Sequence, residues 1–563
     1  MQCLAGQRVN MNIAVIYTLL CVAVLPFWIA QQHLGGRSIP FILATCGYVL
    51  YSLASGINIP MDNTTMIAGS IAVWLLMSLT WTDTKRSVFE LFNLLAYLVL
   101  FTVARTIPLV ITVSAVFTIG VSFATMEAVR IVKRRKFPNA GETFTFGNGN
   151  HTGAFMIVSL FTGIWLVINL SVWFTPFVLL IAAVLIISRC KGAIAGCVSA
   201  GAVTLFITEF WQPAALISLV AAAFVLRRFN AIPNARASIG GRIWLYLASL
   251  EMIVKKPFTG YGLNSYQKEL PDIIARITKS KLHEIAGDRL KAQMNTRSHR
   301  VHNDHLEIMS EIGIPGYLLF VYLFLSVTYD PIILGLLIAF LIHALFFFPF
   351  REVHTAVPFW VIMGSMAGGS ISAVTMPLLI KILIGCIVAA VIIQTLHRFL
   401  GQWYSEMAKN KPGITEEQKL EYIDIAVSHD PYDTGYLSDA AYYYSKANPV
   451  KSFFYAARCL LHYDGTRMKQ GVYDLFARTL IAAKEVNVCH FVEDKALWID
   501  PIFQPAITIK SYLYSRYAGG KKMIDKRRRN GAAVAVVHGV TEGQGVLVGV
   551  DEKNKPQQKQ GGK

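Results

Sequence analysis

Apolar runs long enough to cross a lipid bilayer recur along the chain from residue 12 to residue 396. A bilayer core is about 30 Å thick, so a spanning helix needs roughly 18 or more mostly apolar residues. The whole chain is 54% hydrophobic and only 15% charged, whereas soluble domains carry about a quarter charged residues. Because backbone groups in hydrocarbon must be paired within the protein, the sequence predicts an all-α, polytopic transmembrane helix bundle.

These runs predict about twelve to thirteen spanning helices. The first has no small-residue cleavage site, and we interpret it as a transmembrane helix rather than a removed signal peptide. Glu90, Arg105 and Lys381 are the main ionisable residues within the spans, and no regular spacing pairs them. The predicted spans are residues 12–30, 38–55, 64–81, 88–105, 108–127, 152–170, 172–188, 191–208, 212–227, 314–329, 331–348, 356–370 and 376–396.

Polar segments divide the chain into predicted regions. Residues 1–396 form the transmembrane domain, and its long polar interruption, residues 227–313, is a large loop between the ninth and tenth spans. Residues 397–518 are predicted to form a soluble helical module, in which thirty-four positions separate the matching Asp430 and Asp464. That spacing is the period of a tetratricopeptide (TPR) repeat. Residues 519–563 are basic and polar, a composition typical of disordered tails.

The basic run VKRRKF at residues 132–137 complicates the predicted topology. If the N-terminus is cytoplasmic, alternation of the spans places residues 128–151, residues 227–313 and Arg189 on the outer side. The basic run would then be external, although positive charge normally stays in the cytoplasm. Two interpretations remain open: one span is miscounted, or these external charges bind a ligand.

The formal net charge of +18 indicates anionic partners. No known nucleic-acid-binding motif accompanies it, so we predict no nucleic-acid partner and favour anionic lipid headgroups or a diphosphate substrate. The eight cysteines form no CxxC or Cys/His finger pattern, and no HExxH motif is present. These patterns therefore give no support for a zinc finger or a zinc hydrolase.

Three histidines stand within seven residues of the stretch SHRVHNDHLE, directly before the tenth predicted span. His299, His302 and His305 repeat every three positions, and three interpretations compete. The side chains fan across part of one helix surface and can hold a metal ion. Alternatively, they are solvated residues at the start of an interfacial helix. In the third interpretation, one imidazole acts as a general base on an acceptor hydroxyl, a role that its unperturbed pKa of about 6.5 suits at neutral pH.

Two arginines favour the catalytic interpretation. Arg189 lies in LIISRCKGAIAG, at the mouth of two predicted spans, and Arg242 begins an amphipathic stretch that leads into KKPFTGYGLNSY. Each taken singly can be an interfacial anchor, but an arginine beside apolar sequence is costly unless it meets an anion or a carboxylate. Alternating topology places both on the same side as His302. Because guanidinium groups bind diphosphate oxygens bidentately, the three residues suit group transfer from a lipid diphosphate.

The order of these motifs resembles that of the O-antigen ligase and polymerase superfamily. The matching pieces are FGNGNHTGAF at 146–155, SRxxG at 188–192, GRIW at 241–244, KKPFTGYGLNSY at 255–266 and HNDHLEIMSEIGIPGY at 302–317. The resemblance implies a GT-C-like bundle in the bacterial inner (cytoplasmic) membrane. It also implies glycan transfer from an undecaprenyl-diphosphate-linked donor at the periplasmic face, without metal or nucleotide sugar. The acceptor classes left open are lipid A-core, a growing glycan and protein.

The resemblance also implies roles for individual residues, with His302 as the base and Arg189 and Arg242 as diphosphate ligands. It predicts an O-antigen ligase-like membrane glycosyltransferase. The alternatives are a pilin-type protein O-oligosaccharyltransferase, which the C-terminal module favours slightly, an O-antigen polymerase and, outside the enzymes, a lipid-linked oligosaccharide transporter or flippase. The other residues expected to contact substrate are Asn150, Tyr261, Asn264, His299, Asn303, His305 and Glu307.

Overall fold

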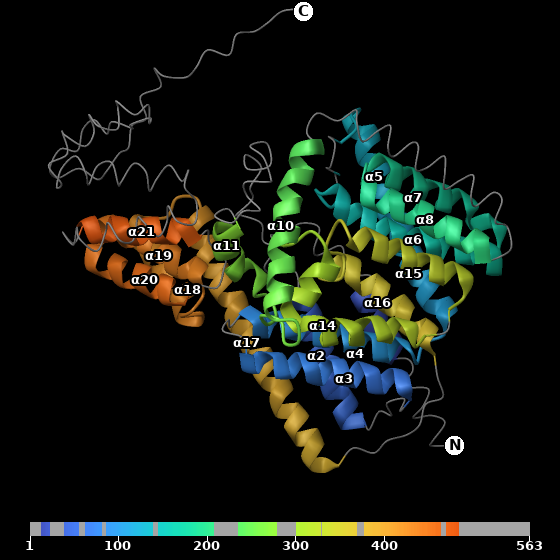
Figure 1. Ribbon diagram of the computed structural model, residues 1–563, viewed down its shortest axis with the longest axis horizontal. Coiled ribbons are helices and arrows are strands. Elements are labelled where there is room, and N and C mark those ends of the chain that lie inside the picture. Colours follow the sequence, from blue (N-terminus) through green and yellow to red (C-terminus); the bar gives the residue numbers. More distant parts are fainter. Residues whose placement is uncertain are drawn as a thin grey trace, which may run out of the picture. The chain divides into compact units, whose positions relative to one another are not determined.

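The computed structural model of the chain describes residues 13–22, 39–55, 62–81, 86–138, 143, 145–207, 235–277, 300–327, 329–368, 377–462 and 469–482. Every regular element in those ranges is a helix (Figure 1), which confirms the predicted all-α class. The chain divides into two compact units. Unit 1 comprises Met1–Ile273 and Ser280–Gln402, and unit 2 comprises Ile274–Lys279 and Trp403–Lys563.

Unit 1 contains the apolar helices, except that the last residues of the helix ending at Asn410 belong to unit 2. Within the described residues, six helices are long and apolar enough to cross a membrane: Asn63–Trp81, Ser87–Ala104, Leu109–Arg134, Gly149–Asn169, Asp304–Leu325 and Ile380–Asn410. Five apolar helices are shorter: Ile13–Val22, Ile39–Ala54, Val172–Ile187, Pro331–Ala344 and Val353–Ala367. The labelled helices are α2 (Ile39–Ser55), α3 (Asn63–Ser78), α4 (Arg86–Ala104), α5 (Leu109–Arg134), α6 (Gly149–Asn169), α7 (Thr175–Ile187), α8 (Lys191–Ile207), α10 (Ala235–Lys255), α11 (Tyr266–Ile277), α14 (Asp304–Leu325), α15 (Pro331–Ala344), α16 (Val353–Ala367) and α17 (Leu378–Asn410).

Each predicted span overlaps one of these helices, except 212–227, which lies outside the described residues. Two helices extend beyond the predicted spans. The helix that contains the span 108–127 continues to Arg134, and the one that contains the span 376–396 continues to Asn410. Hydropathy marks the part of a helix that suits lipid, but polar residues with good helix propensity, such as those of EAVRIVKR, extend the helix beyond that part.

Close helix contacts hold unit 1 together. In Figure 1 the helices α5, α6, α7 and α8 lie side by side, and α15 packs on both α6 and α8. A Cβ atom at Gly196 in α8 would overlap the backbone of Ala339 in α15, so only glycine permits this approach. Small residues serve the same purpose in membrane proteins generally, where close packing replaces the hydrophobic drive between helices.

Helix α14 is kinked at Gly313, whose backbone has φ 75°. The KKPFTGYG segment pairs with the kink through its backbone. The N–H of Tyr261 donates to the carbonyl of Ser310 (3.0 Å), and the N–H of Ile314 donates to that of Pro257 (2.8 Å). The predicted start of the span at residue 314 thus marks the kink, and a separate helical segment, residues 304–312, precedes it.

Unit 2 contains four further helices in its described part: α18 (Glu416–His429), α19 (Thr434–Ala447), α20 (Pro449–Leu461) and α21 (Lys469–Ala482). Each packs against the next along the chain. The Asp424 carboxylate joins α18 to α20, since it accepts hydrogen bonds from Lys451 (2.7 Å) and Tyr455 (2.8 Å). The assignment of these helices to a TPR repeat stays a prediction, and residues 519–563 lie outside the described ranges.

Candidate active site

His302 lies in the turn directly before α14. Its backbone has φ 60°, in the left-handed region that residues other than glycine rarely adopt. The next residue, Asn303, caps α14 by accepting a hydrogen bond from the N–H of Leu306 (3.1 Å). The hydroxyl of Tyr246 in α10 donates to the carbonyl oxygen of His302 (3.2 Å). The conformation of this turn is therefore supported by both α14 and α10.

The imidazole of His302 is half-buried beside Phe348, and the two ring centroids are 5.3 Å apart. Its Nδ1 atom is buried and has no hydrogen-bond partner among the described residues. Burial and the positive charge of Arg242 lower the pKa of His302 to about 4. The ring is therefore neutral at pH 7, and one of its nitrogens can accept a proton.

Arg242 in α10 is half-buried, and its charge acts both on His302 and on the turn between α7 and α8. Burial raises the pKa of the Cys190 thiol to about 11, and the charge of Arg242 opposes that rise. Cys190 directly follows Arg189 in the turn between α7 and α8. Residues from the 188–192, 241–244 and 302–317 motifs thus lie within electrostatic range of one another in unit 1.

Three of the selected residues have an unusual backbone conformation. In the part of the chain that the structure describes, four non-glycine residues have positive φ: Arg135, Arg189 (52°), Asn264 (55°) and His302 (60°). Such conformations cost about 1–3 kcal/mol each and gather at functional sites. Arg189 is exposed, whereas Asn264 is buried.

Asn150, in the first turn of α6, contacts the same α7–α8 turn. The Cys190 thiol donates to Asn150 Oδ1 (3.3 Å), and His343 Nε2 lies 3.3 Å from the backbone oxygen of Asn150. His343 is not predicted as a site residue from the sequence. Its only signal is an ionisable residue near the end of an otherwise apolar run.

A buried ion cluster supports the beginning of α14. Arg351, in the loop between α15 and α16, contacts Glu90 of α4 (3.0 Å) and Glu311 of α14 (2.7 Å). Arg300 contacts Glu307 (2.9 Å). The cluster consists of Glu90, Arg300, Asp304, Glu307, Glu311 and Arg351. Breaking a buried ion group is strongly destabilising, so these residues hold the turn and the loop in one arrangement.

Two sequence interpretations change in view of this cluster. No pairing is evident for Glu90 in the sequence, but its carboxylate meets Arg351, a partner 261 positions away. Glu307 is expected to contact substrate, but its side chain is 1% exposed and accepts the N–H of Val301 (2.9 Å). Its carboxylate thus fixes the backbone immediately before His302.

Two of the remaining predicted residues lie in or beside α14. His305 places Nδ1 3.0 Å from the Tyr317 hydroxyl and Nε2 3.0 Å from the backbone oxygen of Leu341. Tyr261 lies under the ammonium group of Lys256, which is 4.4 Å from the ring centroid. His299 lies outside the described residues.

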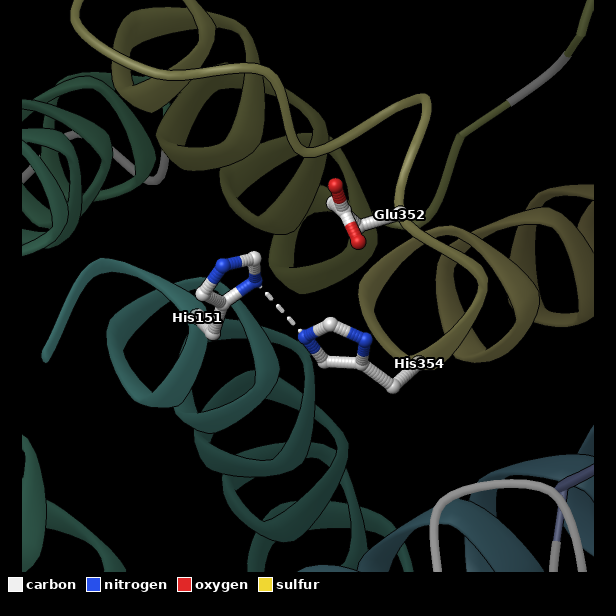
Figure 2. A group of neighbouring side chains, drawn as sticks. All are labelled: His151, Glu352 and His354. Carbon is white, nitrogen blue, oxygen red and sulfur yellow. Dashed lines mark hydrogen bonds between the residues drawn. The ribbon is translucent and has the colours of Figure 1, made fainter. Parts of the chain in front are cut away.

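A second polar group lies in unit 1, and the sequence does not predict it as a site. His151, Glu352 and His354 come together from the starts of α6 and α16 (Figure 2). The signal in the sequence is the charged segment FREVH, residues 350–354, between two apolar runs. Its partner His151 is distant along the chain, so only the fold reveals the group.

Comparison with protein families supports the motif-based resemblance. Residues 176–321 match the family model described as O-antigen ligase, and this segment contains Arg189, Arg242 and His302. No curated protein matches the chain. With its membrane-length helices, the chain is a multi-pass membrane protein, and its residues 176–321 form a domain similar to the O-antigen ligase family.

Proposed function

We propose that the protein is a membrane glycosyltransferase that moves a glycan from an undecaprenyl-diphosphate-linked donor to an acceptor hydroxyl. The proposal rests on one observation. His302 is half-buried, neutral at pH 7 and close to the charge of Arg242, and both residues lie inside the segment that matches the O-antigen ligase family. A neutral imidazole beside a fixed cation is suited to deprotonate an acceptor while an anion develops nearby.

The donor diphosphate binds, in this proposal, to the guanidinium groups of Arg189 and Arg242. A guanidinium keeps its charge at any relevant pH and presents donors in a planar fork that fits phosphate oxygens. Arg189 is exposed and Arg242 half-buried, so neither is enclosed by the protein. Fixed positive charge at the leaving phosphate lowers the barrier, and the proposed step requires no metal.

The reaction is a base-assisted displacement at the anomeric carbon of the donor sugar. A ring nitrogen of His302 takes the proton of the acceptor hydroxyl as its oxygen forms the new glycosidic bond. The bond between the anomeric carbon and the phosphate oxygen breaks, and its electron pair leaves with undecaprenyl diphosphate. The imidazolium then returns its proton to solvent, which restores the neutral base.

The reaction is placed, in this proposal, at the periplasmic face of the bacterial inner membrane. Exposed Lys133, Arg134, Arg135 and Lys136 stand at the C-terminal end of α5. On the periplasmic side these charges attract a phosphorylated lipid, which explains why they depart from the usual cytoplasmic bias. The bilayer holds the polyprenyl chain while the headgroup reaches the arginines.

An acceptor panel tests the function and assigns the branch. The purified protein is supplied with an undecaprenyl-diphosphate-linked glycan and, separately, with lipid A-core, a second lipid-linked repeat or a pilin-like protein. We expect glycan on one acceptor, with lipid A-core the first candidate, and free undecaprenyl diphosphate in an equal amount.

The same assay distinguishes a glycosyltransferase from a transporter. Movement of intact donor across proteoliposomes, with no acceptor modified and no undecaprenyl diphosphate released, would contradict a transferase and favour a flippase. Modification of the pilin-like protein or of the second repeat alone would keep the chemistry and reassign the acceptor.

A further inference from the structure

The group of His151, Glu352 and His354 in unit 1 has no role in the transfer step proposed above. His151 Nδ1 and His354 Nε2 are 2.8 Å apart, and the potential ligand atoms of all three residues lie within 4.8 Å of one another. His151 is 6% and His354 1% exposed. In the part of the chain that the structure describes, no other group of three such residues has this spacing.

The local sequence explains why these side chains converge. His151 is in the first turn of α6, which Asn148 caps. Residues two apart on a helix face different sides, but Glu352 is the N-cap of α16 and has an extended backbone (φ −93°, ψ 117°). It therefore precedes the helical turn, and its carboxylate can approach His354. Figure 2 shows the three side chains meeting between the two helix starts.

We propose that His151, Glu352 and His354 bind one divalent transition-metal ion, with Zn²⁺ as the ion that best fits two imidazoles and one carboxylate. Two histidines, one glutamate and a water molecule form a tetrahedral set that zinc accepts. Ligand nitrogens on such an ion are about 3.3 Å apart. The two imidazoles therefore separate by about half an ångström as the ion replaces the proton that they share.

Aromatic rings surround the histidines and restrict water. Phe347 stands edge-on to His151, at 4.9 Å between centroids and 90°. Phe146 stacks on His354 at 5.3 Å and 21°. An apolar surround of this kind orients ligand rings and limits exchange of the ion with solvent.

The nearby charges can accommodate a dication. Two helix N-termini carry partial positive charge and oppose a cation by themselves. Arg351 precedes Glu352, however, and belongs to the buried ion cluster, in which four carboxyl groups face two guanidinium groups. The cluster thus pairs the charge of Arg351, and the Glu352 carboxylate supplies the negative charge that offsets part of the charge of the ion.

The ion serves to position the active-site turn. Phe348 lies beside both His151 (6.2 Å between centroids) and His302 (5.3 Å). The same loop holds α14, because Phe350 donates its N–H to the Asp304 carboxylate (2.8 Å). A metal that joins α6 to α16 thus fixes the loop on which the His302 turn rests, and it takes no part at the reacting atoms.

Metal analysis of the full-length protein tests this proposal. The protein carries a purification tag without histidines, and its metal content is measured by plasma mass spectrometry. We expect about one zinc per chain, and at least about ten-fold less in His151→Gln and His354→Gln. His397→Gln, which removes an exposed histidine of α17, serves as the matched control and retains the zinc.

A second measurement needs no variant. Wild-type protein stripped with EDTA is titrated with Zn²⁺ alone, and its melting temperature is expected to rise with zinc and not with Mg²⁺. Absence of both zinc and a zinc-dependent melting shift would overturn the proposal and leave a hydrogen-bonded histidine pair. A zinc content of His354→Gln equal to that of the wild type would also overturn the proposal. Loss of glycan transfer with zinc intact would contradict the proposed function alone.

Discussion

Replacement of His302 by alanine is expected to lower the turnover number of glycan transfer by about 10²- to 10⁴-fold, the usual contribution of a positioned general base. The imidazole is the neutral group beside Arg242, and alanine leaves nothing there to accept the acceptor proton. Donor binding should change little, because the proposed diphosphate ligands stay in place. Turnover and KM for the donor are measured in the transfer assay described above.

A loss of activity in His302→Ala must be distinguished from a loss of folding. His302 has a left-handed backbone, which alanine and glutamine adopt less readily than histidine, so both variants carry a similar small additional strain in the turn. His302→Gln also keeps a polar side chain but cannot act as a base near neutral pH. Both should elute and melt as the wild type does. Wild-type turnover in either variant would exclude His302 as the base.

Arg242→Gln is expected to lower turnover by about 10²- to 10³-fold, as removal of a transition-state charge partner does. It should also move the acidic limb of the pH profile. In the wild type, activity falls as His302 becomes protonated near its pKa of about 4. Loss of the neighbouring cation favours the imidazolium, so the His302 pKa and the acidic limb rise, while burial still holds the pKa below its usual value of about 6.5.

Arg242→Lys separates the two effects of the arginine. Lysine keeps the positive charge, so the acidic limb should remain near that of the wild type, while turnover still falls because the bidentate fork is lost. Arg398→Gln removes an arginine that lies over the ring of Phe89 and provides the charge control. An acidic limb that stays fixed in Arg242→Gln would show that this charge does not act on the base.

The positions of the spans could be predicted because lipid demands long apolar runs, but helix ends could not. The ends of α5 and α17 depend on polar residues that continue a helix beyond its apolar part. The kink at Gly313 was marked only by the segment GIPG. Pro315 has no N–H to donate to the carbonyl of Glu311, and the N–H of Gly262 donates to that carbonyl instead (2.8 Å), a contact that hydropathy does not record.

The main candidate residues could be selected from their motifs, whereas their supports could not. Arg189, Arg242 and His302 stand in short motifs with a recognisable order. Phe348 packs beside His302, and Arg351 belongs to the ion cluster that holds α14. Neither residue stands out in the sequence. Their importance arises from contacts between helices that are distant in sequence.

The proposed metal ligands also could not be identified from the sequence alone. Local spacing drew attention to the histidines around His302 as possible ligands. The group that comes together in the fold instead pairs His151 with His354, 203 positions away. Helical spacing predicts which side chains share a face of one helix, but it does not predict which two helices pack together.

The guanidinium groups of Arg189 and Arg242 are proposed to bind a lipid diphosphate, and donor binding tests this role most directly. Equilibrium binding of an undecaprenyl-diphosphate-linked glycan is measured in nanodiscs of zwitterionic lipid, with wild type and an Arg189→Gln/Arg242→Gln double variant. A Lys419→Gln/Lys446→Gln double variant in unit 2 removes the same charge elsewhere. We expect affinity to fall by about 100-fold or more in the first variant and to stay at the wild-type level in the second. Equal affinity in all three proteins would contradict the account.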